Sequence, residues 1–357
     1  SGSLFNLAML YRNTRQYEVA FAVFARTFTI QHALRSPTDK AYKRILRQLD
    51  ETSRRTGTGP EVVGYFEMAL EKLAREGATG TASEVEIKAR FGRLLRYLAD
   101  FDRAEKVLRE ALTVRRRITP PDDISIVADL NNLAGLVRAR GKYGEAGKLY
   151  KEAIDAQIRI KGENTANTGI LLDNIAVMYL TIGQPEEAEP YQKRALAILE
   201  KTLGDEHRST GIALANMAEL YRNLSRYSES EPLFRRAIAI LTKTLPPNHS
   251  LLGAVTDNYA GLFHQRGQHK KALETYRKAI TILTAAHGPE HPEVAVAYNN
   301  IGLALGSLAR HQEAEQSFLK SLAISRRAHG SASIKLATTY ANLADVRVPM
   351  KKYLSLI

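Results

Sequence analysis

Asn132-Leu133-Ala134, followed by Gly141, Ala146 and Ala153, is part of a pattern that recurs along the chain every 42 residues. Two helices can approach closely only where their side chains are small, so small residues at fixed positions predict a repeated helix–helix contact. The asparagine is the clearest marker of this period, and it stands at the following positions: Asn132, Asn174, Asn216, Asn258, Asn300 and Asn342.

Each 42-residue unit has the pattern of two antiparallel amphipathic helices. Large apolar residues stand between the small positions, where they fill the space between helices: Tyr150, Phe234, Tyr276 and Phe318. In one unit the apolar spacing predicts a first helix over residues 209–223 and a second over residues 228–243. A small residue marks the turn inside each pair, as a tight helix–helix turn requires: Gly141, Gly183, Ser225 and Gly267.

The chain resembles the tetratricopeptide repeat through Asn131-Asn132-Leu133-Ala134, Gly141-Lys142-Tyr143, Ala146, Tyr150 and Ala153. The 42-residue period and the loop Gly288-Pro289-Glu290-His291-Pro292 resemble the long-helix subtype found in kinesin light chains and many bacterial proteins. The resemblance extends from about Ala82 to Asp345. It implies an all-α, right-handed superhelical solenoid of stacked antiparallel helix hairpins. It also implies binding of peptide segments or partner proteins in the groove lined by the first helix of each pair.

The pattern predicts how the chain divides. We expect residues 1–35 to form a tetratricopeptide-like hairpin and residues 36–80 a degenerate repeat. Residues 81–346 should form six regular 42-residue units and the start of another, and residues 347–357 a partial last helix or cap. The degenerate repeat places Asp50 where a small apolar residue belongs, and Gly57-Thr58-Gly59-Pro60 at its turn.

Composition limits the classes of function. The 357 residues carry a net charge of +13 and no cysteine, which excludes disulfides, thiol catalysis and cysteine-based metal sites. A basic balance favours acidic peptides, nucleic acid or anionic lipid as partners. The most apolar run, residues 169–183, is too short to span a bilayer, so we expect no membrane span. We expect a cytoplasmic protein, while Ser1-Gly2-Ser3, typical of an engineered start, leaves an upstream leader open.

The sequence offers no convincing catalytic, metal or cofactor motif. His207, His249 and His291 are 42 residues apart, so they should lie in the same loop of successive units, too far apart for one metal ion. We expect them to be loop and helix-start residues. The stretch from Gly135 to Gly141-Lys142 has the wrong spacing for a phosphate loop. We therefore expect no enzyme, no metal and no cofactor.

The register predicts which polar side chains line a groove on the first helices. We expect the partner-binding residues to be Arg12, Arg47, Arg54, Arg93, Arg96, Tyr97, Asn131, Arg138, Asp173, Arg222, Asp257 and Asn299. These residues make the groove basic toward the N-terminus and weakly acidic toward the C-terminus. Because arginine binds carboxylates through two parallel hydrogen bonds, we expect an acidic segment along Arg54, Arg96 and Arg138. The alternative is a solvated stripe of little energetic consequence.

The sequence thus predicts a non-enzymatic scaffold or adaptor that binds a protein or peptide, with an acidic segment as the expected ligand. Two further alternatives stay open. The chain could be a sensor or regulatory arm of a larger signalling protein, which an adjoining effector domain would reveal. It could also bind nucleic acid through its basic surface, which steep salt dependence would reveal. The oligomeric state is left open.

Overall fold

The computed structural model of the chain describes residues 2–120, 123–329 and 336–354. Within this described part every regular element is an α-helix, which confirms the predicted all-α repeat solenoid. By their internal packing the helices fall into two units, Ser1–Glu163 and Asn164–Ile357, which we call unit 1 and unit 2. None of the described helices is both long and apolar enough to cross a membrane.

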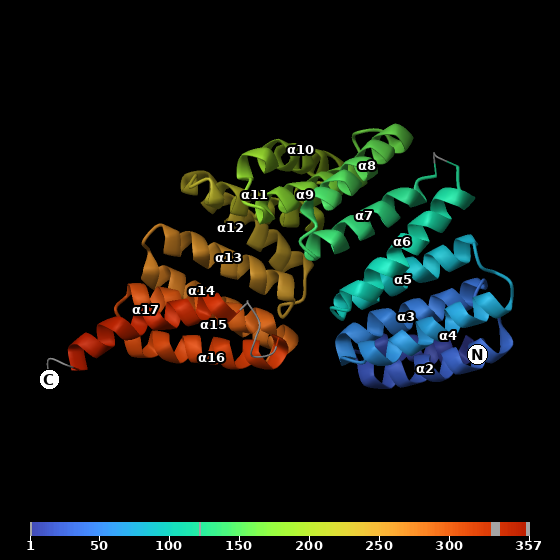
Figure 1. Ribbon diagram of the computed structural model, residues 1–357, viewed down its shortest axis with the longest axis horizontal. Helices are drawn as coiled ribbons and strands as arrows, with labels where there is room; N and C mark the ends of the chain where they lie inside the picture. Colours follow the sequence, from blue (N-terminus) through green and yellow to red (C-terminus); the bar gives the residue numbers. More distant parts are fainter. Residues whose placement is uncertain (1, 121–122, 330–335, 355–357) are drawn as a thin grey trace. The chain divides into compact units, whose positions relative to one another are not determined.

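Unit 1 consists of helix hairpins, drawn from blue to green in Figure 1. Their helices are α1 (Gly2–Asn13), α2 (Tyr17–Leu34), α3 (Lys40–Thr56), α4 (Gly59–Arg75), α5 (Ala82–Tyr97), α6 (Phe101–Ile118), α7 (Ser125–Ala139) and α8 (Tyr143–Lys161). Each odd-numbered helix packs against the even-numbered helix that follows it. Successive hairpins stack because α2 contacts α3, α4 contacts α5, and α6 contacts α7.

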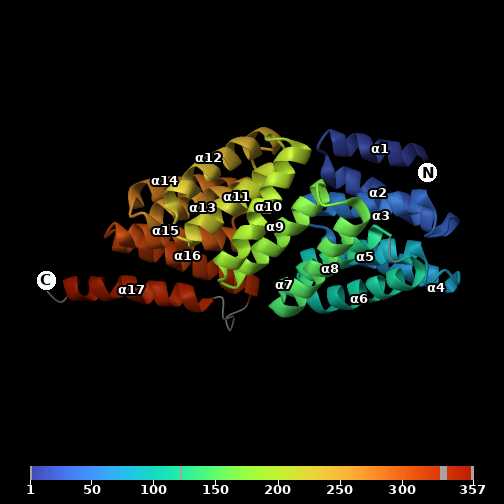
Figure 2. The same cartoon turned by 90° about the horizontal axis from the view of Figure 1, so that it is seen from above.

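Unit 2 continues the same arrangement with a stricter period. Its helices are α9 (Ala166–Thr181), α10 (Pro185–Leu203), α11 (Arg208–Asn223), α12 (Tyr227–Thr244), α13 (Ser250–Gln265), α14 (His269–His287), α15 (Pro292–Ser307), α16 (His311–His329) and α17 (Ala337–Leu354). From α9 to α15 the first helices begin 42 residues apart, as the sequence period requires. The last helix, α17, packs against α16 and is seen from a second direction in Figure 2.

The odd-numbered helices line the inner side of each unit. In unit 1, α5 contacts both α3 and α7, and in unit 2, α13 contacts both α11 and α15. Consecutive even-numbered helices of the described part do not approach each other to the same extent. The hairpins of each unit therefore stack with their odd-numbered helices closer together, which places those helices on the concave face.

The small positions of the repeat lie where the two helices of a hairpin meet. Ala134, Ala146 and Ala153 have no exposed surface, and Tyr150 is buried beside them. Gly302 occupies the position of Ala134 in another unit, and a Cβ atom on it would lie 2.6 Å from the Phe318 ring. The helices are therefore packed too closely there for a larger side chain.

One residue in each hairpin turn has a left-handed backbone. These residues are 42 apart, with φ from 57° to 74°: Arg15, Gly57, Ala99, Gly141, Gly183, Ser225, Gly267 and Ala309. The residue after this left-handed residue donates its N–H to a free carbonyl at the end of the first helix. In one hairpin, Lys142 N–H donates to the Val137 carbonyl at 2.9 Å. The turn geometry is the same in the irregular N-terminal quarter, even where glycine is replaced.

This turn makes a testable prediction about stability. Ala99→Gly should raise the free energy of unfolding by roughly 0.5–1 kcal/mol, because a left-handed backbone strains an L-residue more than glycine's extra chain entropy costs. Gly183→Ala should lower the free energy of unfolding by about 1 kcal/mol, although nothing lies within 4 Å of the new methyl group. Thermal unfolding followed by circular dichroism measures both changes.

Gly144→Ala is the matched control for this pair. It adds the same methyl group inside α8, where nothing lies within 4 Å and φ is not in the left-handed region. This change should raise the melting temperature, because alanine favours a helix over glycine by about 1 kcal/mol. If both glycine-to-alanine changes moved the melting temperature in the same direction, the left-handed backbone would not be the reason why the turn favours glycine.

Candidate partner-binding site

Four arginines stand at the same register position of successive inner helices in unit 1. Arg12 lies on α1, Arg54 on α3, Arg96 on α5 and Arg138 on α7. Partial burial of its guanidinium, and then the charges of Arg138 and Arg54, lower the pKa of Arg96. The charges of Arg54, Arg96 and Arg138 therefore lie close enough to repel one another. We call these three residues the arginine row.

The members of this row differ in how the chain holds them. Arg54 forms an ion pair with Asp50 at 3.0 Å and lies 4.7 Å from the centre of the Tyr97 ring. Arg138 donates to the buried Tyr150 hydroxyl, while its Nε atom has no hydrogen-bond partner. Arg96 has no ion pair within the described residues, and its Nη1 atom lies 2.9 Å from the point where a Cβ on Gly135 would stand. Glycine at position 135 thus leaves room for this cation.

A recess opens between α3 and α5 beside the row. It has a volume of about 490 Å³ and is lined by Asp50, Arg54, Arg90, Arg93, Arg96 and Tyr97; we call it the arginine recess. Burial, followed by the charge of Arg90, lowers the pKa of Arg93, and Asp50 and Asp129 act in the opposite direction. Arg90, Arg93 and Arg96 form no ion pair with any residue of the described part. Three cations therefore share a recess in which the lining carboxylate, Asp50, is already paired with Arg54.

Asp50 and Arg90 are members of this site that the sequence reasoning did not assign to it. Asp50 is 4% exposed and stands where the regular repeats carry alanine, and Arg90 stands where they carry the period-marking asparagine. Both departures from the repeat were visible in the register. Asp50 was assigned to the degenerate repeat and Arg90 to a regular unit, because sequence alone does not place them in the same recess.

A second basic recess lies farther along the same two helices. Its volume is about 380 Å³, and its lining is Lys40, Lys43, Arg44, Arg47, Glu86 and Arg90. Lys43 pairs with Glu86 at 2.8 Å, and Arg47 lies 4.0 Å from Glu51. At the start of the unit, Arg12 donates to Gln48 and lies 3.4 Å from Glu51. Lys43, Arg47 and Arg12 therefore already have acidic neighbours.

Several of the polar residues expected in the groove of unit 2 link one hairpin to the next. Two of the period-marking asparagines donate their amides to the residue 43 positions earlier, at 2.9 Å from Asn216 to Asp173 and 2.7 Å from Asn300 to Asp257, and Asn258 donates to Glu219 at 2.9 Å. Asn342 donates in the same way to Asn299 at 3.0 Å. Asn131, at the equivalent position in unit 1, is half-buried on α7. Asp173 is buried, accepts a further bond from Gln192 at 2.6 Å, and has a pKa raised by burial.

Arg222 is the counterpart of Arg96 in unit 2. Its Nη1 atom lies 3.4 Å from the Cβ position of Gly261, close to the Tyr276 hydroxyl. Unlike Arg96, it has an acidic neighbour, Glu219, at 3.6 Å. The other residues at this register position in unit 2 are Leu180, His264, Gly306 and Val348, so the arginine row has no counterpart there.

Comparison with known proteins identifies the repeat. Models of the tetratricopeptide repeat match residues 87–124, 126–201, 183–243 and 251–327, which together make up more than half of the chain. The chain belongs to the tetratricopeptide-repeat family. This confirms the resemblance seen in the sequence. The tetratricopeptide repeat is generally a protein-interaction fold, and the chain is a protein-interaction scaffold.

Solved tetratricopeptide-repeat structures share the fold at low identity. A Rap protein complexed with competence and sporulation factor is 14% identical, with 98% of each chain covered and a TM-score of 0.61. A tetratricopeptide repeat protein from Parabacteroides merdae is 16% identical over 85% of this chain and 98% of that one, with a TM-score of 0.56. BtubC (BKLC) from P. vanneervenii is 21% identical over 63% of this chain and 91% of that one, with a TM-score of 0.52. No curated protein sequence matches the chain.

The histidines that recur with the tetratricopeptide period are helix caps, as predicted. The Nδ1 atoms of His207, His249 and His291 accept the backbone N–H two residues later, at 3.1 to 3.2 Å. Each bond satisfies one of the free N–H groups at the start of an inner helix.

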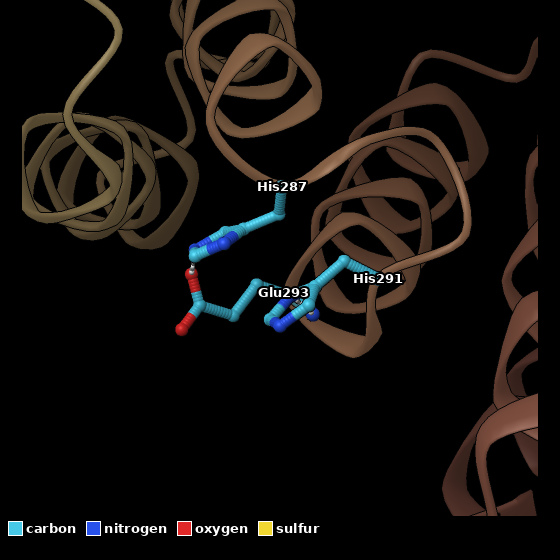
Figure 3. Close-up of side chains that lie close together, drawn as sticks. All are labelled: His287, His291 and Glu293. Atoms are coloured by element: carbon cyan, nitrogen blue, oxygen red, sulfur yellow. Dashed lines mark hydrogen bonds and ion pairs between the residues drawn. The ribbon is translucent and has the colours of Figure 1, made fainter. Parts of the chain in front are cut away.

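One of these capping loops gathers further ligand-type side chains. Donor atoms of His287, His291 and Glu293 lie within 4.8 Å of one another, and the two imidazole rings stack at 4.0 Å (Figure 3). His287 Nε2 lies 3.4 Å from a Glu293 carboxylate oxygen. Because His291 Nδ1 accepts the capping bond, the proton of the neutral ring sits on Nε2. His291 can therefore bind a metal only by giving up its cap.

Asp257 connects two successive tetratricopeptide units, and the pKa of its carboxyl group is raised. One carboxylate oxygen accepts from Asn300, and the other, Oδ1, is buried without a partner. Burial raises the pKa of Asp257 from 3.8 to about 6, with Asn300 and Arg222 acting in the opposite direction. Ionised Asp257 therefore destabilises the folded state, and stability falls as the pH rises from about 4 to about 6.

This titration predicts the effect of Asp257→Asn. The amide oxygen can still accept from Asn300, and the group no longer ionises. The variant should be more stable than the wild type by about 1–2 kcal/mol at pH 7.5, with little difference at pH 4. Asp155→Asn, which neutralises an exposed carboxylate on α8, is the control. An Asp257→Asn effect that is equal at both pH values would show that this carboxylate does not titrate as described.

Proposed function

We propose that unit 1 binds an acidic segment of a partner protein along the arginine row. The observation that carries the proposal is Arg96, a cation held beside Gly135 with Arg54 and Arg138 as neighbours and without an ion pair in the described part. Like charges gathered in this way repel one another, and an anion bound among them relieves that repulsion. A carboxylate of the segment would supply that anion through paired hydrogen bonds to a guanidinium.

The charge distribution supports unit 1 as the location. Its inner helices carry the row and both basic recesses. In unit 2 the residues of the same register are largely uncharged, and Arg222 has Glu219 beside it. Asp173, Asp257 and Asn299 already accept bonds from the next hairpin. The charges on the inner helices of unit 1 therefore complement an acidic ligand, and those of unit 2 do not.

The acidic segment can belong either to a separate protein or to a larger polypeptide that includes this chain. A segment of a larger polypeptide could occupy the row as readily as a separate protein, and the chain would then act as a regulatory arm. Nucleic acid also carries the required negative charge. Against it, Tyr97 is the only aromatic residue among those lining the arginine recess, whereas single strands are bound on rows of aromatic side chains.

Charge reversal at the row tests the proposal. Binding of a labelled oligoglutamate peptide to the full chain is followed by fluorescence anisotropy, with oligoglutamine as the uncharged peptide. Arg96→Glu should weaken oligoglutamate binding roughly ten- to a hundredfold, since a charged hydrogen bond contributes about 1.5–3 kcal/mol. The expected cause is loss of one guanidinium together with repulsion by the new carboxylate.

Lys151→Glu is the matched control, because it changes the net charge equally. Lys151 is exposed on the outer helix α8 and has no ion pair in the described part. Equal weakening by the two variants would mean that overall charge, and not the row, attracts the peptide. Tighter binding of a single-stranded oligonucleotide, released steeply by salt, would replace the proposal with nucleic-acid binding.

A further inference from the structure

We infer that the arginine recess receives a phosphoryl group, carried on a phosphorylated side chain of the bound acidic segment. The inference rests on the proposed function and specifies the chemistry of its ligand. It concerns the recess between α3 and α5, and not the arginine row as a whole.

The balance of charge in the recess favours a doubly charged ligand. Asp50 is paired with Arg54 at 3.0 Å, so these two charges offset each other. Arg90, Arg93 and Arg96 remain without an ion pair in the described part. A carboxylate brings one negative charge and two oxygens. A phosphoryl group brings about −1.5 to −2 charges and three acceptor oxygens, which match three guanidiniums better.

Two arginines of the recess are restrained before any ligand arrives. Arg54 is held from two sides, by the buried carboxylate of Asp50 and by the face of the Tyr97 ring at 4.7 Å. Arg93 is half-buried, and its lowered pKa reflects that burial and the repulsion of Arg90. Arginines fixed in this way lose little freedom when they bind an anion.

Two comparisons within the chain make the recess distinctive. In the neighbouring basic recess Lys43 is tied to Glu86, so an anion would have to compete with an existing ion pair. At the equivalent place in unit 2, Arg222 has Glu219 close to it. The volume of about 490 Å³ in the arginine recess leaves room for a phosphorylated side chain.

The test compares two peptides that differ only in one residue. Both have the sequence Gly-Glu-Glu-X-Glu-Glu-Gly, where X is phosphoserine in one and glutamate in the other. Isothermal titration calorimetry with the full chain should give about tenfold tighter binding of the phosphoserine peptide, because charge-assisted bonds to phosphate add to those of the segment. Arg90→Gln combined with Arg93→Gln should abolish this preference. Arg26→Gln combined with Lys106→Gln, which removes two exposed charges from outer helices, should preserve it.

Each other result overturns the inference in a different way. Equal affinity of the two peptides would leave acidic-segment binding intact and remove the phosphoryl preference. A preference that survives in the Arg90→Gln, Arg93→Gln variant would place the phosphoryl group outside the recess. Inorganic phosphate that binds as tightly as the phosphopeptide would make the recess a site for the free anion. Failure of both peptides to bind would overturn the proposed function as well. Circular dichroism of each variant confirms that it is folded.

Discussion

The close contact between the two helices of each hairpin is the constraint on which the rest of the structure depends. In the regular hairpins alanine or glycine stands where the helices meet, as Ala134 and Gly302 do, and a side chain larger than glycine at position 302 would displace the Phe318 ring. A tight turn with one left-handed residue then reverses the chain. Because contact and turn recur every 42 residues, the inner helices present equivalent positions to the concave face of each unit. A groove residue in one hairpin therefore has a defined counterpart in the next.

The sequence was sufficient to predict this framework. Small residues at a constant spacing indicate a repeated close contact between helices, and the asparagines mark the same period. The N-terminal quarter was harder to interpret, because Asp50 stands at a small position of the repeat and Gly57-Thr58-Gly59-Pro60 at its turn. Arg15 and Ala99 adopt the left-handed turn conformation without being glycine. Propensity disfavours that conformation at both residues, and the packing of the surrounding helices imposes it. Sequence reasoning that looks for glycine therefore misses turns that tertiary structure determines.

The groove was predictable only as a set of equivalent positions. Register placed Arg54, Arg96 and Arg138 together, and their mutual effect on the pKa of Arg96 is consistent with that placement. Register did not reveal which polar side chains already have partners inside the protein. Asp173 and Asn299 accept from asparagines of the following hairpin, and these bonds depend on side-chain directions that a linear pattern does not contain. The residues of the arginine recess could not be grouped for the same reason.

The departures from the repeat explain why the recess lies where it does. In regular units the period-marking asparagine binds a residue of the preceding hairpin and so occupies the concave face with internal hydrogen bonds. In the second and third units that position holds Gln48 and Arg90. Gln48 bonds to Arg12, while Arg90 adds a cation to a space from which the asparagine amide is absent. Asp50 replaces the neighbouring alanine and holds Arg54 in place. Residues that break a repeat reduce its regular packing, and such breaks are expected where a protein carries out its function.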